Sequence, residues 1–433
     1  MRPLRVAICA DFLQEQWPSM DRVAWLLYEE LRPWSRAGVI ASLVRPPFER
    51  RLTRVPLVGR TRTAFSGDRF MNRFWRYPQT LERLKDDFDV FHIVDHSYAH
   101  LAHVLPGDRT VVTCHDLDAF RSVLEPERER RSSVFRTMTR KILAGLQRAA
   151  RVTCDSTAVR TELVGRGLVP ADRVTVVPLG VTRIFAPAPN PACDREAAAL
   201  AQSPPGAIEI LHVGSTVPRK RIDVLLRICA AVRNDFPDVR LVHVGDSLTP
   251  QQQRIASDAG LADRLVAVNG VHDPILAALY RRAALVLLPS EREGFGLPLV
   301  EAMASGTLVV ASDLPVLREV GGSAAEYCAA GDVDAWQATV TALLRERSDN
   351  PARWQQRRDS GCLRASRFTW TQFAASMVDV YWSLLSGASP SGERGRSAES
   401  GRSAESGRSA ESLALQRDSS PKVARTFQAS DLR

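Results

Sequence analysis

Two glutamates and two glycines mark the stretch of this sequence that is best suited to hold a polar, anionic ligand. The segment 290–306 reads SEREGFGLPLVEAMASG and follows an apolar run typical of a buried strand. Gly294 and Gly296 allow close approach to the backbone before a helix whose N-terminal N–H groups favour a diphosphate. Glu293 and Glu301 are unsuited to phosphate, but carboxylates accept hydrogen bonds from sugar or ribose hydroxyls. Two solvated glutamates around a turn are the alternative interpretation.

A pair of adjacent cations supplies a second candidate group. Arg219 and Lys220 follow an apolar run that ends at Gly214, and a helix-like stretch begins directly after Arg221. Adjacent cations at such a junction can neutralise a departing diphosphate, and electrostatic stabilisation of this kind is usually the largest catalytic effect. A solvated basic run at the start of a helix is the alternative.

The N-terminal half offers weaker candidates, which also follow strand-like runs. His115 and Asp116 come directly after VVTC and suit a general acid/base couple or, alternatively, a cap on the strand. A second group either contacts an acceptor or shapes a loop: His92, Asp95, His96, Tyr98 and His100. We predict no metal there, because the group lacks an HExxH pattern and a second cluster of carboxylates.

Short apolar runs alternate with helical patterns in both halves of the chain, which is typical of parallel sheets covered on both faces. The runs begin at residues 5, 38, 89, 110, 151 and 174, and after a segment rich in proline and alanine at 208, 239, 264, 284 and 307. The predicted fold class is α/β, with two tandem doubly wound, Rossmann-like domains. Such sheets bind ligands beyond the carboxyl ends of their strands, so we expect a central ligand cleft between the domains.

Shifts in composition set the predicted boundaries. We predict an N-terminal Rossmann-like domain over 1–183, a linker over 184–206, a C-terminal Rossmann-like domain over 207–368, a final helix over 369–387 and a disordered tail over 388–433. GRSAES occurs three times in the tail, which lacks the apolar surface needed to fold.

The segment 290–306 resembles the E-x7-E signature of glycosyltransferase family 4, whose members are retaining, metal-independent nucleotide-sugar transferases with the GT-B fold. The spacing of the two glutamates, Phe295, Gly296 and the closing Ala-Ser-Gly all agree with that signature. The run HVGSTVPRKRIDVLL at 212–226 is similar to the first strand and phosphate loop of the family's nucleotide domain. This chain departs from the pattern at Ser215, where many members have an arginine.

The resemblance covers about residues 5–387 and implies a role for each site residue. It implies that the two cations and the helix N-terminus neutralise the donor diphosphate, that Glu301 holds the ribose and that Glu293 contacts the donor sugar. His115 resembles the family's histidine that touches that sugar from the other domain, and the last helix is expected to cross back to the N-terminal domain. The predicted donor site comprises Gly214, Ser215, Arg219, Lys220, Glu293, Gly294, Phe295, Gly296, Leu297 and Glu301, with Asp95, His96, Tyr98 and Asp116 on the acceptor side.

Charge separates the two halves of the chain. Residues 1–183 hold 30 Lys and Arg against 21 Asp and Glu, which accounts for the net charge of +9 of the whole chain. The basic segments 45–65 and 127–151 fit an anionic surface, so we predict peripheral contact with an anionic membrane; a core-facing helix with solvated arginines is the alternative for the second. Nucleic acid is not a predicted partner, because the arginines lack interleaved aromatic residues.

Several protein classes are disfavoured. No run approaches the ~20 apolar residues of a membrane-spanning helix, and the apolar stretch near the N-terminus is too short for a signal peptide. The seven cysteines are scattered without a CxxC pair, which is typical of reduced thiols. These features predict a cytoplasmic protein, with any membrane contact at the inner face. Neither GxGxxG after the first strand, GxxxxGK[ST] nor GxSxG is present.

We therefore predict a retaining hexosyltransferase of mannose or glucose type. Its donor is a nucleotide-diphosphate sugar and its acceptor a glycan or lipid-linked molecule, in polysaccharide, lipopolysaccharide or glycolipid biosynthesis. No metal or other cofactor is expected. A nucleotide-sugar epimerase on the same fold and a non-catalytic scaffold that binds carbohydrate or membrane are the alternatives.

Overall fold

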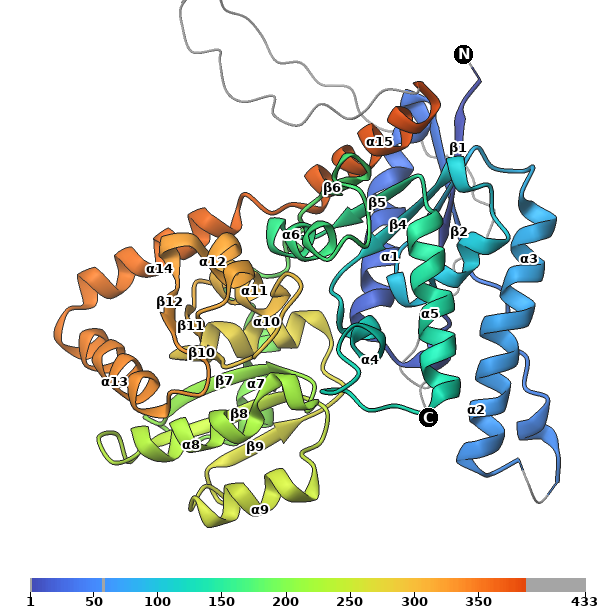
Figure 1. Cartoon of the computed structure of the whole chain (residues 1–433). Coiled ribbons are helices and arrows are strands. Elements are labelled where there is room, and N and C mark those ends of the chain that lie inside the picture. Colours follow the sequence, from blue (N-terminus) through green and yellow to red (C-terminus); the bar gives the residue numbers. More distant parts are fainter. Residues whose placement is uncertain (1, 57–58, 387–433) are drawn as a thin grey trace, which may run out of the picture. The chain divides into compact units, whose positions relative to one another are not determined.

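Two parallel six-stranded β-sheets carry the fold of this protein in a computed structural model that describes residues 2–56 and 59–386 (Figure 1). The first sheet has the strand order β2-β1-β3-β4-β5-β6, and the second has the order β12-β11-β10-β7-β8-β9. Both show the strand crossovers of doubly wound sheets, so the predicted α/β class with two Rossmann-like units is confirmed. The predicted tail, 388–433, lies outside the described residues.

The first sheet is built from residues 4–176. Its central strands β3 and β4 are buried along their whole length, which explains why apolar and exposed polar residues do not alternate in them. The strands are β1 (Leu4–Cys9), β2 (Val39–Val44), β3 (Val90–Ile93), β4 (Thr110–Cys114), β5 (Arg151–Cys154) and β6 (Val174–Val176), and the helices are α1 (Pro18–Leu31), α2 (Arg62–Met71), α3 (Tyr77–Leu84), α4 (Arg121–Leu124), α5 (Ser133–Arg148) and α6 (Thr157–Gly165).

The second sheet is built from residues 208–328. Apolar side chains again fill its central strands, of which β10 is buried throughout. The strands are β7 (Ile208–Gly214), β8 (Val239–Gly245), β9 (Leu265–Val268), β10 (Leu285–Leu288), β11 (Leu308–Ser312) and β12 (Glu326–Cys328), and the helices are α8 (Ile222–Val232), α9 (Pro250–Asp258), α10 (Asp273–Arg282), α11 (Leu297–Ala304), α12 (Pro315–Gly321), α13 (Val333–Asp349) and α14 (Pro351–Ala365).

The segment predicted as a linker, 184–206, contains a helix, α7 (Pro191–Ala201). Its proline stands in the first helical turn, where the missing N–H group has no cost, rather than in an extended strand. The Asn190 side chain caps the helix, and Asp194 pairs with Arg281 of α10 at 2.6 Å. The proline-rich composition therefore gave no indication of this helix, which packs against α10 in the C-terminal half.

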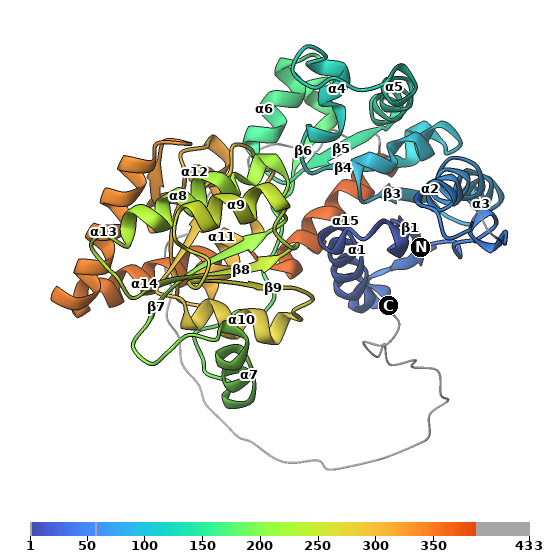
Figure 2. The same cartoon turned by 90° about the horizontal axis from the view of Figure 1, so that it is seen from below.

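The last helix, α15 (Trp370–Ser386), packs against α1 of the N-terminal half (Figure 2). The Tyr381 hydroxyl lies 2.7 Å from Nδ1 of His92 in β3, and Nε2 of the same histidine lies 2.7 Å from the Thr113 hydroxyl in β4. Burial lowers the pKa of His92 to about 3, so the ring is neutral. This polar chain through the core anchors the C-terminal helix to the first sheet.

Among the described residues, none of the helices combines the length and the apolar composition that crossing a bilayer requires.

Candidate active site

The loop between β10 and α11 places Glu293 at the centre of a compact charged cluster. Its carboxylate accepts a hydrogen bond from Nζ of Lys220 at 2.5 Å and from the Ser290 hydroxyl at 2.7 Å, while Nη1 of Arg219 lies 3.5 Å away. Burial alone would raise the pKa of Glu293, but the charges of Lys220 and Arg219 outweigh burial, and the pKa lies below its usual value. Glu293 is therefore an ionised carboxylate that lies between the cations of Lys220 and Arg219.

The loop after β7 divides the three basic residues that the sequence offers. Arg219 and Lys220 turn toward Glu293 from a short 3₁₀ turn, Pro218–Lys220, and Lys220 is 8% exposed. Arg221 instead pairs with Asp223 at 2.9 Å and with Glu291 at 2.6 Å. The structure thus singles out the first two cations for this cluster.

A buried glycine caps the N-terminus of α11. Gly296 has φ +92°, a left-handed conformation that glycine adopts freely, and a Cβ there would lie 2.7 Å from the Leu317 side chain. Leu297 begins the helix directly beside Glu293. Phe295 is buried and packs edge-on against Phe368 with ring centroids 5.5 Å apart. On the neighbouring loop Gly214 has φ +155°, and Ser215 is half-buried.

Glu301 lies in the second turn of α11, and both of its carboxylate oxygens have hydrogen-bond partners. One carboxylate oxygen accepts a hydrogen bond from Nη1 of Arg22 at 2.9 Å, and the other accepts one from the Tyr280 hydroxyl at 3.1 Å. Burial raises the pKa of Glu301 to about 7, because it outweighs the opposing charge of Arg22. Arg22 belongs to α1 of the N-terminal half, so this contact joins the two halves.

His115 lies at the end of β4, against the loop that holds Glu293. A Cβ on Gly294 would lie 1.9 Å from the His115 carbonyl oxygen, and the Ser156 hydroxyl donates to the Gly294 carbonyl at 2.9 Å. The imidazole itself turns into the first half: Nδ1 lies 2.7 Å from Asp155 and Nε2 lies 2.8 Å from the Val94 carbonyl. Burial would lower the pKa of His115, but the charge of Asp155 outweighs it and raises the pKa to about 9.

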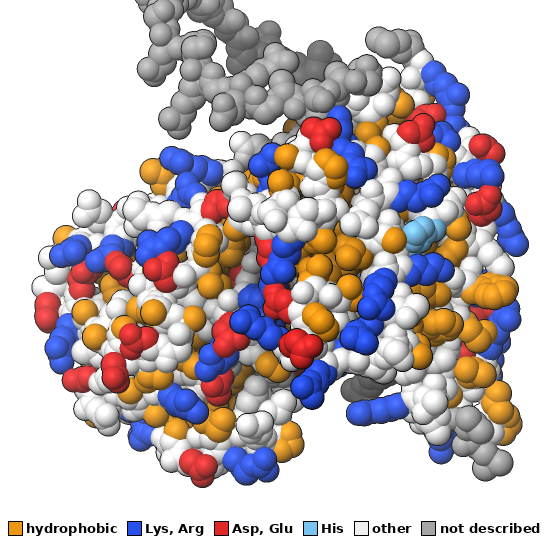
Figure 3. Space-filling model, in the orientation of Figure 1, with side chains coloured by type: hydrophobic (Ala, Val, Ile, Leu, Met, Phe, Trp, Pro, Cys, Tyr) orange, Lys and Arg blue, Asp and Glu red, His pale blue; other side chains and the backbone are white. Residues whose placement is uncertain are grey.

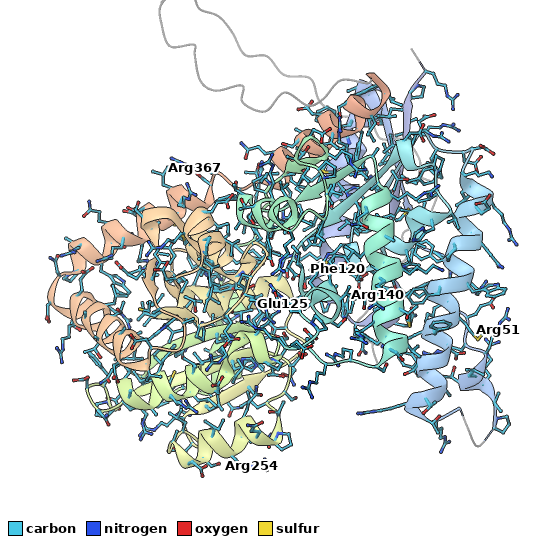
Figure 4. The ribbon with its side chains drawn as sticks, in the orientation of Figure 1. Arg51, Phe120, Glu125, Arg140, Arg254 and Arg367 are labelled. Carbon is cyan, nitrogen blue, oxygen red and sulfur yellow. The ribbon has the colours of Figure 1, made fainter. Side chains whose placement is uncertain are left out.

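The four predicted acceptor-side residues gather at the carboxyl edge of the first sheet. His96 lies 3.5 Å from Asp95 and 3.6 Å from Asp116, and its ring stands 5.4 Å from that of Phe120, which Figure 4 marks beside α4. The Tyr98 hydroxyl lies 3.3 Å from a carboxylate oxygen of Glu15. The sequence positions therefore do converge in space.

Two further groups at this edge were missed by sequence reasoning. The guanidinium of Arg73 lies 4.2 Å over the Tyr98 ring and 3.8 Å from Glu15. Asp11 is buried after β1, where burial and the neighbouring charge of Asp95 raise its pKa well above the usual range. Asp11 directly follows an apolar strand and could have been found by that signal; Glu15 and Arg73 carry no local signal.

A cavity of about 500 Å³ lies next to the cluster and is lined by both halves of the chain. Its walls include Asp116, Asp118 and Arg121 from the first half and Arg292, Glu293 and Val316 from the second. Acidic and basic side chains gather on the face of the molecule that Figure 3 shows. Glu125, which Figure 4 labels, pairs with Arg121 at 2.5 Å. Leu117, Val159 and Leu314 also line the cavity, so its surface is largely apolar with charged side chains at its walls.

Comparison with known families agrees with this arrangement. The model described as "Glycosyltransferase Family 4" matches residues 22–185, and the model described as "Glycosyl transferases group 1" matches residues 207–346. The chain belongs to glycosyltransferase family 4. The two matches fall on the first and second sheets respectively, and together they include every residue of the predicted donor site.

Curated relatives in this family match about half of the chain. The MMP α-(1→4)-mannosyltransferase of Mycolicibacterium hassiacum is 34% identical over 233 residues, 52% of each chain. The D-inositol 3-phosphate glycosyltransferase of Thermobispora bispora is 32% identical over 250 residues, 55% of this chain and 56% of the relative. The matched region thus spans about half the length of these relatives.

Solved structures confirm the GT-B fold of the family 4 member. Sucrose-phosphate synthase from Thermosynechococcus elongatus has a TM-score of 0.63 at 22% identity, covering 90% of this chain and 100% of its own. The Anabaena protein HepE, solved in complex with UDP and glucose, has a TM-score of 0.65 at 16% identity, covering 88% of this chain and 100% of its own. At these identities the likeness concerns the fold alone.

Proposed function

We propose that this protein is a retaining glycosyltransferase that moves a hexosyl group, of mannose or glucose type, from a nucleotide-diphosphate sugar to a glycan or lipid-linked acceptor. The observation that carries the proposal is the Glu293 carboxylate held between Lys220 and Arg219 on the loop that leads into the N-terminus of α11. Cations and helix N–H groups gathered at one point suit a group that gains negative charge as a bond breaks.

In the proposed reaction the bond between the anomeric carbon and the diphosphate oxygen breaks, a bond from that carbon to an acceptor hydroxyl oxygen forms, and the hydroxyl proton passes to the departing diphosphate. Charge then develops on the diphosphate. Lys220, Arg219 and the N–H end of α11 at Leu297 stabilise that charge, so we propose that the reaction needs no metal. Glu293 and the backbone at Phe295 and Gly296 hold the donor sugar by accepting and donating hydrogen bonds.

The remaining roles follow the same geometry. Glu301 binds the ribose, and Gly214 with Ser215 lets the backbone approach the phosphates. His115 acts from the first half on the donor sugar, chiefly through its strand-end backbone and positive charge, because both ring nitrogens are engaged with Asp155 and Val94. The edge formed by Asp95, His96, Tyr98 and Asp116 receives the acceptor.

The first experiment is a thermal-shift screen of the full chain with UDP-, GDP- and ADP-sugars, because a ligand that binds only the folded state raises the melting temperature. HepE was solved with UDP, which makes UDP-sugars the first panel to test. We expect one nucleotide class to raise the melting temperature. Release of the nucleoside diphosphate is then measured with and without candidate acceptors. Acceptor-dependent release supports a transferase, conversion of the donor without acceptor supports an epimerase, and no shift with any nucleotide contradicts the proposal.

A matched pair of variants tests the cluster itself. Lys220→Gln removes the cation that touches Glu293, and we expect about a 10²- to 10³-fold loss of turnover, comparable to removal of one stabilising donor. Arg221→Gln is the control, since its guanidinium pairs with Asp223 and Glu291 and faces away from the cluster. Equal losses in both variants would contradict the assignment.

We also propose peripheral contact of the N-terminal half with an anionic membrane at the inner face of the cell membrane. Exposed aromatic side chains stand beside arginines on α2 and the π-helix Asn72–Arg76: Phe70 is 52% and Trp75 is 68% exposed. Figure 3 shows hydrophobic side chains next to basic ones on the face over α2. Aromatic rings with basic neighbours are what an interfacial helix presents to anionic lipid.

Sedimentation with lipid vesicles tests this contact. Vesicles that contain anionic lipid are expected to bind the protein at low salt, and uncharged vesicles are expected to bind it weakly. Trp75→Ala should reduce binding, whereas Leu363→Ala, an equally exposed residue on α14 at 68%, should not. Absence of binding to anionic vesicles at low salt would remove the proposal.

A further inference from the structure

Arg219, one of the two cations that the proposed function assigns to the diphosphate, already has protein partners. Its Nε lies 3.0 Å from Oδ2 of Asp118, and its Nη1 donates to the Arg292 carbonyl at 2.9 Å and lies 3.5 Å from Glu293. A guanidinium has a limited number of donors in fixed directions. A diphosphate that binds Arg219 must therefore take the place of a partner or share it.

Asp118 is the partner most suited to exchange. The Arg292 carbonyl belongs to the same loop as the donor site, and Glu293 is fixed independently by Lys220 and Ser290. Asp118 comes from the other half of the chain, and its second oxygen lies 2.9 Å from Nε of Arg292. The Asp118 carboxylate therefore lies between Arg219 and Arg292 of the second half, as the anionic group of a ligand would.

The electrostatics point the same way. A diphosphate beside Arg219 would bring negative charge close to the Asp118 carboxylate, and like charges at such distances repel. Asp118 retains Arg121 of its own half, at 3.3 Å, as a partner when it gives up Arg219. Its side chain is 23% exposed, so water is also available to it.

A second ion pair of the same kind involves Glu301, the proposed ribose ligand. Arg22 of the first half and Tyr280 each donate to one of its oxygens, at 2.9 and 3.1 Å. Nη2 of Arg22 also lies 3.3 Å from Asp273, and the guanidinium lies 5.3 Å from the centroid of the Phe185 ring. Ribose hydroxyls that donate to Glu301 must compete with these hydrogen-bond donors.

We propose that Asp118 and Arg22 are positioning residues that pair with the donor-binding groups when no donor is bound: Asp118 pairs with Arg219, Arg22 pairs with Glu301, and a nucleotide sugar exchanges these two ion pairs for contacts with its diphosphate and ribose. This inference rests on the proposed function, because it takes Arg219 and Glu301 as donor ligands. It adds that the N-terminal half competes with the donor for both groups.

Calorimetric titration of the full chain with UDP, GDP and ADP tests the exchange. Asp118→Asn keeps the size of the side chain and removes its charge. Arg22→Gln removes the cation that donates a hydrogen bond to Glu301. Asp118→Asn is expected to bind the nucleotide about two- to fivefold more tightly than the wild type, because a partly exposed ion pair such as Asp118–Arg219 contributes up to ~1 kcal/mol. Arg22→Gln is also expected to bind it more tightly, because the buried Glu301 carboxylate loses its cationic partner. Both should also lower the melting temperature of the empty protein, since each loses an ion pair that joins the halves.

The controls break ion pairs of similar type away from the site. Asp235→Asn removes a partner of Arg345, at 3.1 Å, and Arg32→Gln removes a pair with Glu29, at 3.0 Å, at the far end of the helix that holds Arg22. Neither should change nucleotide affinity. Asp118→Glu keeps the charge and should restore wild-type affinity.

The outcomes separate the two proposals. If the wild type binds none of the three nucleotides, the proposed function fails and the exchange fails with it. If the wild type binds a nucleotide and both variants bind it equally or more weakly, the exchange is wrong while the proposed function stands. Tighter binding in Asp118→Asn and Arg22→Gln, together with a lower melting temperature of the empty protein, is a combination that mere loss of structural support does not produce.

Discussion

Replacing Glu301 by glutamine should make the protein's stability less sensitive to pH. Burial raises the pKa of Glu301 from 4.5 to about 7 in the folded protein, so between these two values the folded state binds a proton that the unfolded state has lost. A state that binds more protons is stabilised by acid, and the wild type therefore loses stability as the pH rises from about 4.5 through 7. A glutamine side chain carries no proton to lose, so the Glu301→Gln variant should lack this contribution.

The two pKa values fix the magnitude. A rise from 4.5 to about 7 corresponds to about 3 kcal/mol above pH 7, and most of this falls between pH 5 and pH 8. We therefore expect Glu301→Gln to gain about 2–3 kcal/mol relative to the wild type between these two pH values. Urea unfolding followed by tryptophan fluorescence at pH 5 and pH 8 measures this double difference.

A matched control separates this effect from the general acid response of the protein. Glu209→Gln removes another buried carboxylate, which pairs with Arg282 at 2.5 Å at the start of β7, and it is measured alongside at both pH values. If the difference between wild type and Glu301→Gln is the same at pH 5 and pH 8, Glu301 is ionised throughout, and burial does not dominate its titration.

Two further predictions follow from contacts at the end of β4. Gly294→Ala would place a Cβ 1.9 Å from the His115 carbonyl oxygen, so it should cost about 1–3 kcal/mol of stability and reduce turnover. Gly165→Ala is the control and should do neither, because a Cβ there meets no atom within 4 Å. Equal melting temperatures and activities for the Gly294 variant and the wild type would contradict the contact. The pKa of His115 is raised from 6.5 to about 9, so the stabilisation from its pair with Asp155 is fully present below pH 6.5 and is lost as the pH rises through 9. Urea unfolding should show the wild type losing up to about 3 kcal/mol of stability over this window relative to His115→Gln, and the exposed His103→Gln is the control. A constant difference in stability between the wild type and His115→Gln would mean that the ring is neutral.

The sheets and the centre of the site were predictable because both follow from local patterns. The runs at Leu285–Leu288 and Ile208–Gly214 are apolar and short, and adjacent parallel strands bring their carboxyl ends to one edge. Given that β10 pairs with β7, this rule explains why Glu293, which follows the first run, lies beside Lys220, which follows the second, with the two side chains 2.5 Å apart. The strand order itself does not follow from local patterns.

The contacts between the halves were not predictable from local sequence. Arg22 and Glu301 are 279 positions apart, and nothing in the helix that contains Arg22 distinguishes it from the many other arginines of the N-terminal half. Asp118 lies only three residues beyond His115, but its partners, Arg219 and Arg292, come from two separate loops of the second half. Such pairs depend on how the two sheets meet, and short-range patterns carry no information about that.

The charges of the site explain why the two halves and the donor are expected to act together. Each cation or carboxylate that is proposed to bind the donor is neutralised inside the protein: Lys220 by Glu293, Arg219 by Asp118, and Glu301 by Arg22. An uncompensated buried charge is costly, so these partners stabilise the empty protein. Two of the three partners belong to the N-terminal half. A donor that replaces these partners therefore breaks ion pairs between the two halves and forms new contacts with the same groups. The free energy of donor binding then depends on Asp118 and Arg22 even if neither residue touches the donor.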